Sequence, residues 1–202
     1  MNKLKHWPLE WHQFLPVMVL LIFAVIAFIF ENELINQWVY KRDFIAQGEL
    51  WRLFSCHLFH TNLNHLLLNL GGLILLWSLH GQYYNVKNYT LLLLVSGGIV
   101  SSAIYFYSPQ LSQYVGLSGV LHGVFIWGAL KDISNKVMSG YLLAIGVILK
   151  VIHEQIYGAD ESVAKLIDAT VAIDAHLWGV ISGILFFVMG MIIKVFSNKK
   201  KA

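Results

Sequence analysis

Two short segments carry residue types that could perform nucleophilic chemistry in an otherwise apolar chain. Ser118 lies in the segment 116–123, which reads GLSGVLHG, and His176 lies in the segment 175–183, which reads AHLWGVISG. Polar and ionisable groups are energetically costly inside membrane segments, so their default interpretation is a functional site. A serine on one helix and a histidine on another suffice for a nucleophile and its base, with the histidine taking the serine proton.

Glycines spaced four residues apart follow each of these two residues. Gly119 and Gly123 follow the serine, and Gly179 and Gly183 follow the histidine. Such small-xxx-small patterns allow two helix backbones to approach closely in a membrane, and short Ser and His side chains meet only where helices do so. The alternative is that both motifs serve only to pack helices. The presence of both in one chain favours the nucleophile hypothesis, in which Gly116 also supports the serine.

A third polar group lies on the second apolar segment. His65 and Asn69 are four residues apart, so they share one helix face. Both side chains can donate hydrogen bonds, which suits an oxyanion hole completed by the Ser118 backbone N–H; one such donor is typically worth about 3 kcal/mol in an acyl-transfer barrier. The alternative is a polar cluster that holds the helix to its loop. His122 is also four residues from Ser118, but side chains with this spacing lie alongside each other, so we rank that pair below Ser118–His176.

Competing chemistries find less support. A zinc site of the H-E-x-x-H type would need a second histidine, which residues 153–157 (HEQIY) lack. An aspartyl pair would need two acids at depth, whereas Asp132 and Asp174 are expected at opposite membrane edges. The single cysteine, Cys56, excludes an internal disulfide. We therefore expect no metal and no cofactor.

The composition indicates a single all-α integral membrane domain over residues 1–202. The chain is 57% hydrophobic and 12% charged, and a soluble domain would carry about twice that charged fraction. The apolar segments predict six transmembrane helices, at residues 14–30, 58–79, 89–107, 117–131, 138–153 and 174–194. Lys3 and Lys5 precede the first segment as in a signal peptide, but no small-residue cleavage site follows before Glu31, so we expect a retained helix.

The basic residues predict the orientation of the bundle. With the N-terminus in the cytoplasm, nine Lys and Arg residues fall on the cytoplasmic side and four on the other, with Lys150 inside the fifth span. This distribution favours a cytoplasmic location for both termini. The nine are Lys3, Lys5, Lys87, Lys131, Lys136, Lys194, Lys199, Lys200 and Lys201, and the four are Lys41, Arg42, Arg52 and Lys165. Basic residues at segment ends, with a net charge of +3, do not indicate nucleic-acid binding. Residues 31–57 and 154–173 become long outer segments, the second a candidate cover over a site.

The depth of Ser118 can be estimated from the predicted spans. Ser118 lies thirteen residues before Lys131, which marks the cytoplasmic edge. At about 1.5 Å per residue this is about 20 Å along a helix, or roughly 10 Å below the outer surface of a 30 Å core. Residues 108–115 must then dip into the membrane, where irregular backbone is tolerated only beside protein or water. A water-filled cavity open to the outer face would meet this requirement and supply the water for hydrolysis.

Together these residues resemble the rhomboid family of intramembrane serine proteases. The resemblance covers most of the chain, from residues 49–52 (ELWR) to the last helix. The matching motifs are Trp51-Arg52, His65-xxx-Asn69, Gly116-x-Ser118-Gly119 and residues 175–183. The resemblance implies a six-helix rhomboid-like bundle with a Ser118–His176 dyad and no third acid. It also implies an oxyanion site from His65 and Asn69, and cleavage within or beside a transmembrane segment of the substrate.

One departure from the family pattern suggests a subgroup. Many members carry a tyrosine, packed against the catalytic histidine, where this chain has His122. The short six-helix form and the segment 116–123 are similar to the rhombosortases of Gram-negative bacteria. That resemblance implies a multi-pass protein of the bacterial inner membrane, with a site open to the periplasm. It implies lipid contact and membrane-anchored protein substrates that carry a C-terminal Gly-Gly signal, an apolar helix and a basic tail.

The leading hypothesis is therefore a serine endopeptidase. The alternative is a non-catalytic relative that binds transmembrane helices for quality control, and a transporter ranks third. The binding hypothesis predicts a missing serine or histidine, but this chain has both residues.

Overall fold

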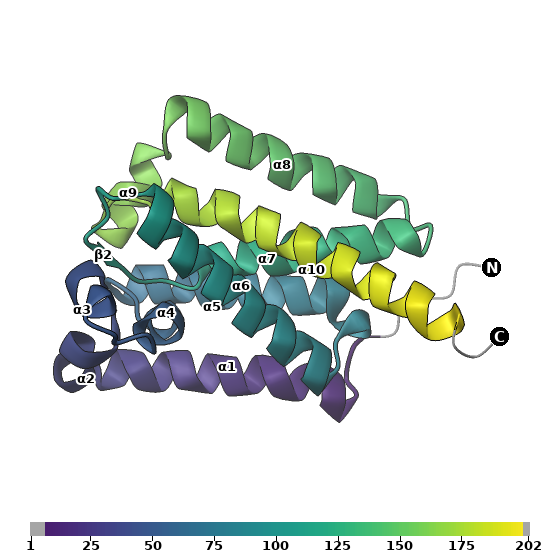
Figure 1. Cartoon of the computed structure of the whole chain (residues 1–202), viewed down its shortest axis with the longest axis horizontal. Helices are drawn as coiled ribbons and strands as arrows, with labels where there is room; N and C mark the ends of the chain where they lie inside the picture. The colour runs from purple at the N-terminus through teal and green to yellow at the C-terminus, as the bar shows by residue number, and fades with distance from the viewer. Residues whose placement is uncertain (1–6, 200–202) are drawn as a thin grey trace.

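The computed structural model describes residues 7–199 and is built almost entirely of helices (Figure 1). Five of the described helices are long and apolar enough to cross a membrane. They are α1 (Trp11–Ile29), α5 (Leu63–His80), α6 (Val86–Tyr107), α8 (Ser139–Tyr157) and α10 (Ile173–Lys199). The expected class, an all-α membrane protein with several spans, is thus confirmed.

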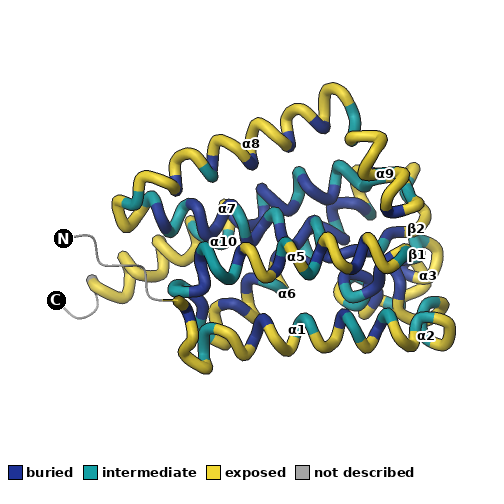
Figure 2. Tube along the Cα trace, turned by 180° about the vertical axis from the view of Figure 1, so that it is seen from behind, coloured by how far each residue is buried: buried dark blue, intermediate teal, exposed yellow. Residues whose placement is uncertain are grey.

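The helix that begins with the candidate nucleophile lies at the centre of the bundle. This helix, α7 (Ser118–Ser134), has 17 residues, of which ten are buried, so it is enclosed by its neighbours (Figure 2). A helix of this length rises about 25 Å, somewhat less than the 30 Å hydrocarbon core. An enclosed helix shorter than the membrane can begin below the outer surface, as the sequence predicts for Ser118. That α7 makes a sixth span stays a prediction.

Two helix ends lie a few residues from the predicted span boundaries. The second span was expected from residue 58, whereas α5 begins at Leu63, because the Asn62 side chain accepts a hydrogen bond from the His65 backbone N–H at 2.8 Å and caps the helix. The fifth span was expected to end at residue 153, but α8 continues to Tyr157. Its last turn carries Glu154, which is buried and bonded to α10.

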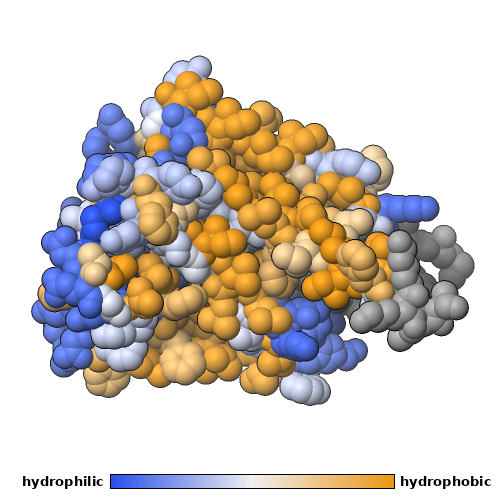
Figure 3. Space-filling view, in the orientation of Figure 1, coloured by the Kyte–Doolittle hydropathy of each residue, from blue (hydrophilic) through white to orange (hydrophobic). Residues whose placement is uncertain are grey.

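The long helices alternate in direction along the bundle. The start of α1 and the end of α10 lie at one end, and α2 (Glu31–Trp38), α3 (Arg42–Ala46) and α9 (Glu161–Ile167) lie at the other (Figure 1). On the face in Figure 3, apolar side chains form a broad band over the middle, and hydrophilic ones gather at the end with α2, α3 and α9. This pattern suits a membrane belt with two polar ends. Among the residues behind the predicted orientation, Lys3, Lys5, Lys200 and Lys201 lie outside the described residues.

Short elements fold the connections over the end of the bundle that carries α2, α3 and α9. They include β1 (Tyr40–Lys41), α4 (Arg52–Ser55), the 3-10 turn η1 (Cys56–Leu58) and β2 (Gln113–Tyr114). The 3-10 turn η2 (Gly81–Tyr83) follows α5 at the opposite end, where it contacts α1. Strands β1 and β2 pair antiparallel, with Tyr40 opposite Tyr114. This pairing ties residues 31–57 to the segment that leads into Ser118. The buried Arg52 stabilises the loop from within, donating to the Val39 carbonyl at 2.8 Å and to Glu49 at 2.6 Å.

Candidate active site

The structure brings Ser118 and His176 together. Ser118 is the first residue of α7, and His176 lies in the first turn of α10. The Ser118 Oγ lies 3.0 Å from Nε2 of His176, which is hydrogen-bond distance for a hydroxyl and an imidazole. This geometry allows the imidazole to take the hydroxyl proton as the oxygen attacks a carbonyl carbon.

The predicted glycines lie where α7 and α10 cross. A Cβ at Gly179 would overlap the carbonyl oxygen of Gly119, and a Cβ at Gly183 would overlap that of Gly123. On the other helix, a Cβ at Gly119 would lie only 2.9 Å from the Ala175 carbonyl oxygen. The two backbones are therefore in direct contact, as small residues permit. Because Ala175 precedes His176, this contact sets the distance across which the serine and histidine meet.

Gly116 shapes the backbone that leads into α7. Its φ of 118° lies in a region that side-chain-bearing residues rarely adopt. A Cβ at this position would also lie 2.8 Å from Nε2 of His65. The Gly116 carbonyl accepts a hydrogen bond from the Tyr114 hydroxyl at 3.0 Å. The turn thus needs glycine for conformation and for space beside His65.

His122 packs directly against the imidazole of His176. The two ring centroids are 4.1 Å apart and the ring planes are 21° from parallel. Nδ1 of His122 lies 2.7 Å from the Ser118 carbonyl oxygen, so His122 donates there and does not reach the Ser118 hydroxyl in this arrangement. We predict from the sequence that His122 supports the dyad, and in the structure its ring stacks on the proposed base.

His65 and Asn69 are both buried on α5, near the serine. Nδ1 of His65 contacts the Thr61 hydroxyl at 3.1 Å and the Thr61 backbone N–H at 3.4 Å, and Nε2 is the nitrogen that faces Gly116. The Asn69 amide donates one hydrogen to the His65 carbonyl at 3.0 Å and retains a second. Both residues line a cavity together with Ser118 and His176, so each can present a donor beside the serine.

Two cavities meet at Ser118. One, of about 370 Å³, lies under the connections near α2 and α9 and is lined by both Glu31 and Thr170. The other, of about 320 Å³, has an apolar wall along α5 and α7 that includes Leu75 and Phe125. Ser118 and His65 line both cavities. A reacting group at Ser118 is thus reachable from a polar side and from an apolar side.

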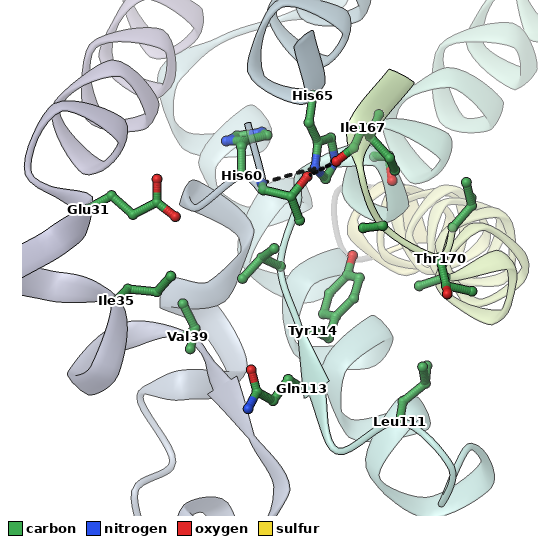
Figure 4. A pocket seen from close by; sticks show the side chains of 16 residues that line it. Glu31, Ile35, Val39, His60, His65, Leu111, Gln113, Tyr114, Ile167 and Thr170 are labelled. Carbon is green, nitrogen blue, oxygen red and sulfur yellow. Dashed lines mark hydrogen bonds between the residues drawn. The ribbon is translucent and has the colours of Figure 1, made fainter. Parts of the chain in front are cut away.

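The polar cavity is shown in Figure 4, with His60 and His65 side by side above Tyr114. The His60 and His65 rings meet edge to face with centroids 5.0 Å apart. Burial, together with the nearby His65, lowers the pKa of His60 to about 3, so His60 is uncharged at neutral pH. Burial raises the pKa of the Glu31 carboxyl across the cavity. The cavity therefore offers polar groups for water, with no charge on the imidazole beside His65.

A second serine–histidine pair is located elsewhere and is fully enclosed. Ser101 Oγ lies 3.0 Å from Nε2 of His57, and Ser101 is 0% exposed. The His57 nitrogens also face the carbonyl oxygens of Gly97 and Gly116, at 3.1 and 3.2 Å. No substrate reaches this serine in the described structure. The pair anchors η1 to α6 and to the turn before α7.

The structure places an acid beside the predicted Ser118–His176 dyad. Glu154 Oε2 lies 2.8 Å from Nδ1 of His176, on the side of the ring opposite Ser118. Lys150, one helical turn earlier, lies 2.8 Å from the same carboxylate. The sequence analysis assigned neither residue to this site and placed the end of the fifth span at residue 153. The available signal was the Lys150-xxx-Glu154 spacing, which places two charges on one face of an apolar helix.

Three of these side chains have the spacing of metal ligands. The potential ligand atoms of His122, Glu154 and His176 all lie within 4.8 Å of one another. The Lys150 Nζ, however, lies 2.9 Å from Nε2 of His122, 2.8 Å from Glu154 and 3.0 Å from Nδ1 of His176. An ammonium group therefore takes the position that a metal ion would need.

Comparison with known families agrees with this geometry. A family model described as the rhomboid domain matches residues 47–192, which contain every candidate site residue named above except Glu31. The chain belongs to the rhomboid family. Rhomboid proteins are generally intramembrane serine proteases, so a protease-type function is supported for this member. A search of curated proteins found no match to this rhomboid chain.

Proposed function

We propose that this rhomboid protein is an intramembrane serine endopeptidase in which Ser118 is the nucleophile and His176 the general base. The observation that carries the proposal is the 3.0 Å contact between Ser118 Oγ and His176 Nε2 where two cavities meet. His176 takes the serine proton as Oγ bonds to the substrate carbonyl carbon, and returns it to the leaving amine. Water from the polar cavity then releases the acyl group from the enzyme.

The oxyanion that forms in this reaction needs donors beside Ser118. The Ser118 backbone N–H lies in the first turn of α7, where helix N–H groups have no partner within the helix. The His65 imidazole, when it carries a proton on Nε2, and the second amide hydrogen of Asn69 provide further donors. Fixed donors of this kind stabilise the developing negative charge without reorganisation. We therefore assign the oxyanion site to these three groups.

A serine-directed covalent probe tests the proposal against the alternative of a non-catalytic helix-binding protein. We expect a fluorophosphonate or isocoumarin probe to label the wild-type protein in membranes, because an activated serine attacks such reagents. The Ser118→Ala variant is expected to lose the label. Gel fluorescence, with the modified peptide identified by mass spectrometry, gives the readout. A folded wild-type protein that takes no label would support the helix-binding alternative.

We further propose a substrate class, that of the rhombosortase subgroup. A transmembrane helix hides its carbonyls in its own hydrogen bonds, so a substrate must unwind locally before Ser118 can attack it. Glycine lowers this cost by about 1 kcal/mol per residue relative to alanine. A Gly-Gly pair just outside a C-terminal apolar helix would place the scissile bond near the polar cavity and the helix against the apolar one. The proposed orientation has the substrate domain in the periplasm of a bacterial inner membrane and the basic tail in the cytoplasm.

The mature C-terminus of a substrate tests this class. We expect cells with active enzyme to release a protein bearing such a signal, shortened near its Gly-Gly pair, either as the free domain or carrying a further modification. Intact mass spectrometry of the protein from wild-type cells and from Ser118→Ala cells gives the comparison. An intact helix and basic tail in both strains would overturn the substrate assignment without affecting the labelling result.

A further inference from the structure

The surroundings of His176 contain an ion pair between the buried Glu154 and the partly exposed Lys150, which a serine–histidine dyad does not require. Glu154 is 8% exposed, and its Oε2 lies 2.8 Å from Nδ1 of His176. Lys150 Nζ lies 2.8 Å from the other oxygen of the same carboxylate. Charges in a membrane helix are costly and are retained where they are paired and functional. Because Glu154 and Lys150 contact the imidazole that faces Ser118, we expect their function to be an effect on His176.

Donor and acceptor roles in this cluster follow from the partners. The Ser118 carbonyl can only accept, so His122 donates from Nδ1 and accepts from Lys150 at Nε2. The ammonium also donates to Glu154, whose carboxylate can only accept and so takes the Nδ1–H of His176. Nε2 of His176 then has a lone pair for the Ser118 hydroxyl. The hydrogen bonds form a chain that begins at the Ser118 carbonyl and ends at its hydroxyl.

We propose that Glu154 is a positioning residue that completes a Ser118–His176–Glu154 triad, with Lys150 as its counter-ion; the proposal rests on the serine-protease function above. Lys150 Nζ lies 3.0 Å from Nδ1 of His176. Without the carboxylate, the ammonium would donate to Nδ1 and leave the ring proton on Nε2, where the ring cannot accept the serine proton. The carboxylate selects the productive tautomer and stabilises the imidazolium that forms during attack.

The two charged residues act on His176 with opposite sign. The titratable groups that face this imidazole are Lys150 and Glu154 from α8, His122 from α7 and His65 from α5. The Glu154 charge favours the imidazolium and the Lys150 charge opposes it. Removing the carboxylate should therefore move the acidic limb of the pH–rate profile to lower pH. Removing the ammonium should move the same limb to higher pH.

The experiment measures the second-order rate of Ser118 labelling by a fluorophosphonate as a function of pH, on the full chain in detergent micelles. Glu154→Gln is expected to lower the rate at neutral pH by about 10²- to 10⁴-fold, as tautomer loss does in other serine triads, and to shift the acidic limb to lower pH. Lys150→Met is expected to lower the rate less and to shift the limb to higher pH. Glu154→Asp keeps an acceptor-only carboxylate and should be faster than Glu154→Gln.

The matched control is His153→Gln, which removes an exposed titratable side chain next to Glu154 and should leave both rate and profile unchanged. A wild-type rate and profile in Glu154→Gln would overturn the triad. A lower rate in Glu154→Gln would also overturn the triad if thermal stability fell in parallel and the acidic limb stayed in place. A purely structural role of Glu154 predicts that pattern. Absence of labelling in the wild type would overturn the serine-protease function itself, a result distinct from both.

Discussion

Replacing either Ser118 or His176 by alanine is expected to lower peptide-bond turnover by about 10⁵- to 10⁶-fold, and replacing both is expected to cost no more. The reason is that neither group works alone: without the imidazole the hydroxyl keeps its proton, and without the hydroxyl there is no nucleophile. The 3.0 Å contact between the two side chains is what makes them one unit. Turnover of a membrane-anchored reporter in liposomes, with purified single and double variants, gives the measurement.

The second serine–histidine pair supplies the control. Ser101→Ala removes the hydrogen bond from the enclosed Ser101 to His57, and we expect it to keep turnover, since no substrate reaches that serine. If the fold-losses of turnover in the two single variants multiply in the double variant, Ser118 and His176 do not act as a unit. Normal cleavage by His176→Ala, together with loss in His122→Ala, would make the assignment of the base wrong.

The sequence predicted correctly which site residues lie together where a residue type is unusual in its surroundings. A serine between glycines and a histidine beside two more glycines are unusual in apolar helices, so Ser118, His176 and their glycines could be selected before any coordinates. The apolar runs likewise predicted the five spans that the structure supports. In each case the signal is local, contained within a few turns of one helix.

Glu154 could not be identified in the same way, because its role depends on which helix face it occupies and what packs there. Residues 153–157 follow the apolar segment, yet α8 continues through them to Tyr157, and Glu154 meets an imidazole of α10 2.8 Å away. Thr61 is a second case. It orients His65 from the loop before α5 and donates to the Ile167 carbonyl at 2.5 Å, a contact between segments about a hundred residues apart.

A single added methyl group at Gly179 is expected to abolish activity. Its Cβ would overlap the Gly119 carbonyl oxygen, in the backbone contact between α10 and α7. Neither partner is the flexible end of a side chain, so the helices must separate, and overpacking of this kind typically costs about 1–3 kcal/mol or more. Gly179 lies one turn after His176, so the separation also lengthens the distance between the imidazole and Ser118. Gly179→Ala should therefore lose both thermal stability and fluorophosphonate labelling.

Gly190→Ala provides the matched control on the same helix. A Cβ at Gly190 meets nothing within 4 Å, and alanine favours a helix over glycine by about 1 kcal/mol. This variant should keep wild-type labelling and melt at the same or a higher temperature, so any loss in Gly179→Ala reflects the contact rather than the glycine. The shift in stability between the two variants, measured by thermal unfolding in one detergent, isolates the effect of the close approach. If Gly179→Ala labels and melts like Gly190→Ala, then α7 and α10 do not need this approach to join the serine to the histidine.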